Sequence, residues 1–216
     1  GINAEYGDMT EKPVIVKIVL QGESGVGKTS TLRSYIDKTY TNQQVHYDVG
    51  VEFRVKAIQS TFQGNQIDLK LQIWDIATGG ERFRPLAPII FRGASAALFL
   101  FDTTNHNSLD VASRQIVEMR DNEQNKNIQF LLVGTKIDIA NLRQVTREEA
   151  ERLAERHNTQ YVEISNVDGT GVDPCFEQLI QRVVEHPSFE GKAKSEELLQ
   201  ISKRVLEDDR PKRLCQ

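Results

Sequence analysis

The sequence predicts an α/β fold in which a six-stranded, mostly parallel sheet is flanked by helices. Two observations support this prediction. Short apolar runs alternate with amphipathic segments from Val14 to about Val184, as expected when strands alternate with helices. Two of the runs, 96–101 (AALFLF) and 128–133 (IQFLLV), are apolar throughout or nearly so, which is typical of strands covered on both faces.

The individual elements follow from the pattern in chain order. Strands are predicted at 14–20, 49–59, 66–74, 96–101, 128–133 and 161–164. Helices are predicted at 28–37, 108–121, 146–156 and 173–185. The third helix begins with a capping box, in which Thr146 is the N-cap and Glu149 follows three residues later. A turn around Gly64-Asn65 predicts a hairpin, so one edge pair should be antiparallel.

Composition restricts the classes of function. The chain has 216 residues, of which 38% are hydrophobic, and this favours one compact domain with extensions. The net charge of −4 argues against nucleic-acid binding, which requires a concentrated basic face. Two cysteines and four scattered histidines support neither a disulfide framework nor a zinc site. Without a membrane-spanning apolar run or a secretory signal, we expect a cytoplasmic monomer.

The domain is expected to cover residues 13–186, because His186-Pro187 ends the alternating pattern. Residues 1–12 are expected to be a disordered N-terminal segment or a remnant of expression. Residues 187–216 form a C-terminal extension in which 195–208 can build one more helix with apolar side chains at i, i+3, i+7 spacing. That helix either packs on the same domain or binds a partner, and a basic tail follows it.

A phosphate-binding loop is the strongest motif. Residues 22–29 (GESGVGKT) match G-x-x-x-x-G-K-[ST] between a predicted strand and a predicted helix. The glycines let successive N–H groups point at a phosphate, and the helix directs its positive end at the same anion. Lys28 should reach the β- and γ-phosphates, and the Thr29 hydroxyl should ligate Mg²⁺. The predicted phosphate-binding residues here are Gly22, Ser24, Gly25, Val26, Gly27, Lys28 and Thr29.

The choice of base depends on Thr135-Lys136-Ile137-Asp138, which follows an apolar strand. A carboxylate at Asp138 can accept from N1–H and N2–H₂ of guanine, whereas adenine offers no such donors. A polar group left unpaired in this way discriminates by roughly 10⁴-fold. Taken alone, Asp138 could equally be a solvated loop carboxylate. A phosphate-loop kinase or ATPase is disfavoured, because Asp138 selects against adenine and no phosphate-acceptor lid is recognisable.

Together these motifs resemble those of the Ras-like small GTPases, and within them the Rab family. The base loop of that family is Asn-Lys-x-Asp, Asp75 closes the third predicted strand, and Ser165-Asn166-Val167 stands where the family has Ser-Ala-Lys. Rab-like stretches are 49–53 (VGVEF), 70–75 (KLQIWD), 82–84 (RFR), 91–94 (FRGA) and 98–104 (LFLFDTT).

The resemblance implies a Ras-like phosphate-loop fold, GTP or GDP as bound nucleotide, and Mg²⁺ held by Thr29 and, through water, by Asp75. It places Lys136 along the base and the Asn166 backbone N–H at O6. Tyr40 either lies against the guanine edge or is a plain surface tyrosine. The implied guanine-binding residues are Tyr40, Thr135, Lys136, Asp138, Ser165, Asn166 and Val167. The implied role is a vesicle-traffic switch whose partners are effectors, exchange proteins and activating proteins.

Both switch segments depart from the family pattern. Asp48 stands where a threonine ligates Mg²⁺ and senses the γ-phosphate. In 74–83 (WDIATGGERF) one residue is inserted, and Gly80 replaces the water-positioning glutamine. Either Thr78 or Gly79 takes the place of the γ-phosphate-binding glycine, and we favour Gly79 because close approach to phosphate requires no side chain. These changes favour slow GTP hydrolysis; the alternative is a nucleotide-binding scaffold that recruits partners without cycling.

Two further departures concern the base loop and the C-terminus. Thr135 replaces the asparagine that braces the base loop, and its loss should weaken nucleotide binding by about 1–2 kcal/mol. Val167 replaces the lysine of Ser-Ala-Lys. A single Cys215 stands where Rab proteins carry paired cysteines for lipid. One lipid chain gives marginal binding to the cytosolic face of a membrane, and an unmodified tail is the alternative.

Overall fold

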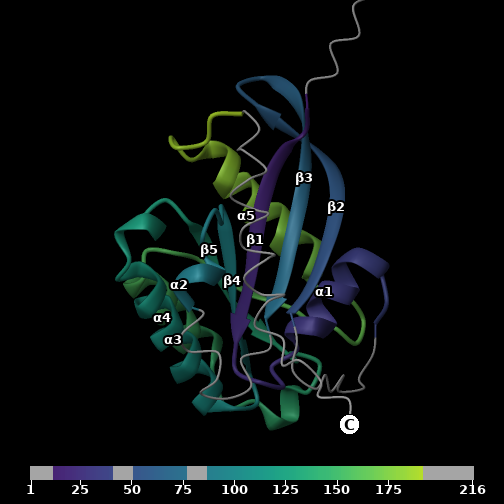
Figure 1. Ribbon diagram of the computed structural model, residues 1–216. Helices are drawn as coiled ribbons and strands as arrows, with labels where there is room; N and C mark the ends of the chain where they lie inside the picture. The colour runs from purple at the N-terminus through teal and green to yellow at the C-terminus, as the bar shows by residue number, and fades with distance from the viewer. Residues whose placement is uncertain (1–11, 41–50, 77–86, 192–216) are drawn as a thin grey trace, which may run out of the picture.

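The computed structural model describes residues 12–40, 51–76 and 87–191 (Figure 1). Several predictions concern residues outside these ranges. These predictions concern residues 1–11, the first-switch residue Asp48, the second-switch residues Thr78, Gly79 and Gly80, the segment 195–208, and Cys215.

Six strands form one sheet in the order β2-β3-β1-β4-β5-β6. The strands are β1 (Val14–Gly22), β2 (Val51–Phe62), β3 (Asn65–Ile76), β4 (Ala96–Asp102), β5 (Gln129–Thr135) and β6 (Tyr161–Glu163). The edge pair of β2 and β3 is antiparallel, and the other neighbouring pairs are parallel. The predicted mostly parallel, six-stranded sheet is therefore confirmed.

The four predicted helices are present as α1 (Lys28–Asp37), α3 (His106–Arg120), α4 (Arg147–Arg156) and α5 (Val172–Glu185). A further helix of one turn, α2 (Ala87–Ile90), and short 3-10 turns at Glu123–Asn125 and Ala140–Leu142 were not predicted, because they are too short for a periodic pattern.

Only half of the predicted capping box forms at α4. Thr146 is the N-cap, and its hydroxyl accepts a hydrogen bond from the Glu149 N–H at 3.2 Å. The Glu149 carboxylate instead contacts His106 Nε2 on α3 at 2.7 Å.

The hairpin turn lies one residue earlier than predicted. Gln63 and Gly64, with φ of 50° and 80°, join β2 to β3, and Asn65 already belongs to β3. A two-residue turn with both φ values positive matches the twist of antiparallel strands, and glycine suits its second position.

Apolar side chains pack on both faces of the sheet. Helices α1 and α5 cover one face, where Tyr35 and Phe176 stack with ring centroids 3.8 Å apart. Helices α2, α3 and α4 cover the other face, where Ile90, Ile116 and Leu153 join one cluster with residues of β4 and β5 (Figure 1). Among the described residues, no helix is long and apolar enough to cross a membrane.

The parallel strands β1, β4 and β5 all end at the same edge of the sheet. In Figure 1, β1 (purple) runs from the upper end of the sheet to the lower end, where the loop to α1 begins. In open α/β sheets, ligands bind outside the carboxyl ends of the strands. The lower edge is therefore where the predicted site residues should meet.

Candidate nucleotide-binding site

The phosphate loop is the tight connection between β1 and α1. Gly22, Gly25 and Gly27 adopt φ values of 153°, 83° and 102°, which residues with a side chain rarely adopt. A Cβ on Gly22 would also collide with the carbonyl oxygen of Leu100 on β4. Gly27 is the N-cap of α1 and supplies no side-chain cap, so the first N–H groups of α1 are left for an anion.

Lys28 crosses this loop from the first turn of α1. Its ammonium donates to the carbonyl oxygens of Gly22 at 2.8 Å and Glu23 at 2.9 Å. Burial lowers the pKa of Lys28, and the nearby carboxylates of Asp75 and Glu23 act in the opposite direction. An ammonium has three protons, so two bonds to the loop leave one donor for a phosphate oxygen.

Thr29 and Asp75 form the candidate metal position. The Thr29 hydroxyl donates to Asp75 Oδ2, and Asp75 Oδ1 is buried without a hydrogen-bond partner. Burial raises the pKa of Asp75, and the Thr29 bond and the charge of Lys28 counteract this. An unpartnered carboxylate oxygen beside a hydroxyl fits a hard divalent cation such as Mg²⁺.

The described residues contain no cluster of three or more His, Cys, Asp or Glu that could hold a metal by itself.

The base loop begins where β5 ends. The Thr135 hydroxyl lies 2.6 Å from the Val26 carbonyl oxygen, so it connects the base loop to the phosphate loop. Lys136 follows with φ 61°, and its ammonium pairs with Asp102 Oδ2 at 2.6 Å. Asp102 closes β4 and also accepts from the N–H and hydroxyl of Thr104. The Lys136 side chain is therefore held at its charged end.

Asp138 is oriented by the loop after β6. Its Oδ1 accepts from the Ser165 hydroxyl at 2.8 Å, and Ser165 Oγ in turn accepts from the Val167 N–H at 3.2 Å. Asp138 is exposed, so a held carboxylate faces solvent beside the base loop. This arrangement suits a carboxylate that must accept two hydrogen bonds from one face of guanine.

Tyr40 lies next to the same loop. Its ring covers Gly169, where a Cβ would come within 2.5 Å of Tyr40 Cε1, and the Gly169 N–H donates to the Ser165 carbonyl oxygen at 3.0 Å. Tyr40 is 42% exposed. The ring is thus positioned by a glycine with φ 81°, in reach of a base beside Ser165.

The family model that matches is that of the Ras family, over residues 17–185. The chain belongs to the Ras family. It is 37% identical to the Ras-related protein Rab-18 of Caenorhabditis briggsae over 182 residues, 84% of this chain and 87% of that protein. Identity to Rab-11A of Dictyostelium discoideum is 34%, over 82% of this chain and 79% of that protein. Identity to Rab-1 of Theileria parva is 34%, over 83% of this chain and 81% of that protein. The resemblance to Rab-type small GTPases is confirmed.

The structure of this Ras-family chain places most predicted site residues at one edge of the sheet. The phosphate loop, Asp75, the base loop, the loop after β6 and Tyr40 are linked by the contacts above. Sequence reasoning missed Asp102, which pairs with Lys136; Thr31, which accepts from the Asn166 amide at 3.0 Å; and Gly169, which lies under the Tyr40 ring. A carboxylate at the end of β4, like Asp75 at the end of β3, could have indicated Asp102; no sequence signal indicated the others.

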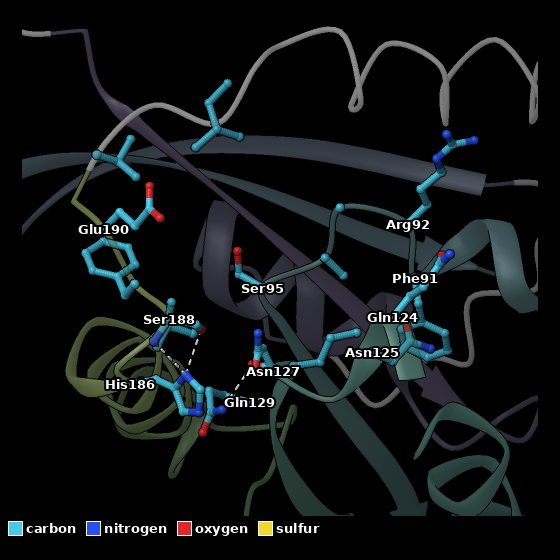
Figure 2. Close-up of a pocket in the computed structure, with 17 residues that line it drawn as sticks. Phe91, Arg92, Ser95, Gln124, Asn125, Asn127, Gln129, His186, Ser188 and Glu190 are labelled. Carbon is cyan, nitrogen blue, oxygen red and sulfur yellow. Dashed lines mark hydrogen bonds between the residues drawn. The ribbon is translucent and has the colours of Figure 1, made fainter. Parts of the chain in front are cut away.

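A separate cavity of about 390 Å³ lies away from this site (Figure 2). It is bounded by the starts of β1 and β5, by Ser95 before β4, and by the segment after α5, where His186 Nδ1 lies 2.7 Å from Ser188 Oγ. Because these strands run toward the phosphate loop, the cavity lies at the opposite edge of the sheet from the nucleotide-binding site.

Proposed function

We propose that this Ras-family chain is a guanine-nucleotide switch in vesicular traffic that hydrolyses GTP slowly. The observation that carries the binding claim is the phosphate loop. There Lys28 and Thr29 belong to the first turn of α1, which has no side-chain cap; Thr29 bonds to Asp75, whose charge also acts on Lys28. Such a loop offers an ammonium, backbone N–H groups and a Mg²⁺ position to one polyphosphate.

Guanine is the proposed base because Asp138 is held by Ser165 with its carboxylate exposed beside the base loop. A carboxylate pairs with the two donors of guanine and meets a lone pair in adenine. Displacement of a fluorescent GDP analogue tests this. GTP should displace it at concentrations far below those that ATP requires, and equal competition would exclude guanine specificity.

Slow hydrolysis is proposed from the second switch segment. Phosphoryl transfer in this class needs a residue that orients the attacking water, and Gly80 has no side chain to do so. Asp48 would add negative charge near the γ-phosphate, which disfavours a closed GTP-bound conformation. Glu81, beside Gly80, is a candidate to position the water in place of the missing glutamine.

Phosphate release under single-turnover conditions tests the rate. It should fall below roughly 10⁻⁴ s⁻¹, the order of unassisted Ras-type hydrolysis. A rate at or above that order contradicts the proposal. Gly80→Gln is an informative companion variant, but the segment also carries one inserted residue, so the wild-type rate decides.

A second candidate function is a scaffold that binds nucleotide and recruits partners without cycling. The same switch substitutions favour it, and undetectable hydrolysis with tight GTP binding would distinguish it. In both cases we propose one domain at residues 13–186 that binds effectors through its switch segments at the cytosolic face of membranes. Exchange and activating proteins act only on the cycling form.

A further inference from the structure

We infer that the Asn166 side chain is a positioning residue for the phosphate loop, an inference that rests on the proposed binding of guanine nucleotide. Asn166 lies between β6 and α5, and its Nδ2 donates to Thr31 Oγ1 at 3.0 Å and to the Gly27 carbonyl oxygen at 3.4 Å. One amide therefore connects the loop beside the base to the first turn of α1.

The carbonyl of Gly27 is the target of three donors. Besides the Asn166 amide, it accepts from the Thr31 N–H and from the Thr31 hydroxyl, each at 2.8 Å. The peptide bond is planar and trans, so fixing the Gly27 carbonyl also fixes the Lys28 N–H, which points the opposite way. That N–H is among the first of α1 and is expected to face phosphate.

The burial of Asn166 argues against a purely stabilising role. Its side chain is nearly buried, and its Oδ1 has no hydrogen-bond partner. Burying an unpaired carbonyl oxygen costs free energy, which an alanine at this position would avoid. The benefit of the amide is therefore what Nδ2 holds in place, namely Gly27 and Thr31.

Asn166 and Thr135 act on consecutive peptide units of the phosphate loop. The Thr135 hydroxyl contacts the Val26 carbonyl oxygen at 2.6 Å, and the Asn166 amide reaches the next carbonyl, that of Gly27. Thr135 stands where the family has an asparagine, so the side-chain amide is missing there. In this chain, Asn166 supplies a side-chain amide to the same loop. The two side chains together brace the loop from the side of the base.

The test is dissociation of a fluorescent GDP analogue from the full chain, measured after adding excess GDP. Asn166→Ala should speed dissociation about 5–10-fold, the effect of losing one or two hydrogen bonds. Asn125→Ala is the matched control, because Asn125 is equally buried and donates to the Met119 carbonyl oxygen at 3.0 Å beside the remote cavity of Figure 2. The control should lower the melting temperature and leave dissociation unchanged.

A second variant, Thr31→Val, removes the hydroxyl that accepts from the Asn166 amide and keeps the shape of the Thr31 side chain. It should speed dissociation in the same direction, and the double variant Asn166→Ala/Thr31→Val should be less than multiplicative. The factor by which Asn166→Ala speeds GDP dissociation should stay the same when EDTA removes Mg²⁺, because the Asn166 amide contacts no proposed Mg²⁺ ligand.

The inference is overturned if the Asn166→Ala variant binds GDP and releases it at the wild-type rate. It is also overturned if the effects of Asn166→Ala and Thr31→Val on the rate multiply fully in the double variant. If Asn166→Ala does not fold, unchanged dissociation in Thr31→Val alone overturns it. Failure of the wild-type chain to bind GDP would instead refute the proposed function.

Discussion

The Thr135 hydroxyl lies 2.6 Å from the carbonyl oxygen of Val26, a residue 109 positions earlier in the chain, and 3.0 Å from that of Phe101. One short side chain thus contacts the phosphate loop and β4 from the base loop. The sequence predicts weaker nucleotide binding because Thr135 replaces an asparagine. The hydroxyl keeps a link to the phosphate loop, which limits that loss.

Thr135→Val should remove this link without changing the shape of the side chain. The hydroxyl has one proton for the carbonyl oxygens of Val26 and Phe101, so the variant removes one hydrogen bond and GDP affinity should fall about 5–10-fold. Thr135→Ser keeps the hydroxyl and should remain near wild type. Equilibrium titration of a fluorescent GDP analogue measures both. Equal affinities for the Val and Ser variants would mean that the hydroxyl does not support the loop.

Asp138→Asn should shift base preference from guanine toward xanthine. An amide donor can meet the 2-carbonyl of xanthine, which a carboxylate repels, and the Ser165 hydroxyl can still donate to the amide oxygen. We expect a change of at least about 10³-fold in the ratio of XDP to GDP affinity, by the size of discrimination that an unpaired buried group gives. Competition titrations measure this ratio. Retained GTP preference would place Asp138 away from the base.

Lys17, on β1, predicts a pH dependence of folding stability. Its ammonium donates to the Arg92 carbonyl oxygen at 3.0 Å and lies 4.7 Å from the centre of the Trp74 ring. Burial lowers the pKa of Lys17 from 10.5 to about 8. Between these values the unfolded chain holds a proton that the folded chain has released, so the Lys17 contribution to stability rises with pH.

The variant Lys17→Met tests this pH dependence, because methionine has no titratable proton. From pH 8 to 10.5 the free energy of unfolding of wild type should rise relative to this variant, by on the order of 3 kcal/mol at 1.36 kcal/mol per pKa unit. Urea denaturation across this range measures the difference. Lys70→Met, at a partly buried position on β3, controls for the general effect of replacing a lysine of the sheet by methionine. A constant difference between wild type and Lys17→Met would contradict the lowered pKa.

The helix after the phosphate loop and the existence of the central strands were predictable, because their signals are local; the strands β1, β4 and β5 end one or two residues later than predicted. Residues 28–37 were predicted as a helix with the bounds that α1 has. The hairpin was found, but its turn was displaced by one residue, since Asn65 suits a turn and a strand start equally well. Glu149 completes a capping box in the sequence, yet His106 on another helix holds its carboxylate.

The site was predictable as a set of motifs and not as a set of contacts. The residues proposed to face the nucleotide carry the motif pattern, because chemistry dictates their type. The contacts from Asn166 to Thr31 and from Lys136 to Asp102 join segments 135 and 34 positions apart. Such pairs depend on how the loops meet at the edge of the sheet, which no local pattern encodes.

Asp75→Asn should separate metal binding from folding. Asp75 is buried, which raises the pKa of its carboxyl, and Oδ1 has no partner in the described structure. Asparagine keeps the shape and can still accept from Thr29 while avoiding the burial of a charge. Stability without metal should therefore be equal to wild type or higher. The variant loses the charge that favours Mg²⁺, so Mg²⁺ should slow GDP release less effectively.

The measurement is GDP release with Mg²⁺ and with EDTA. Removing Mg²⁺ should speed release from wild type by a factor roughly tenfold larger than from Asp75→Asn, because a charge-assisted contact contributes about 1.5–3 kcal/mol. Lys28→Ala provides the contrast: it loses the ammonium proposed to contact phosphate, so it should release GDP faster in both conditions. An EDTA effect as large in Asp75→Asn as in wild type would mean that Asp75 does not act on the metal.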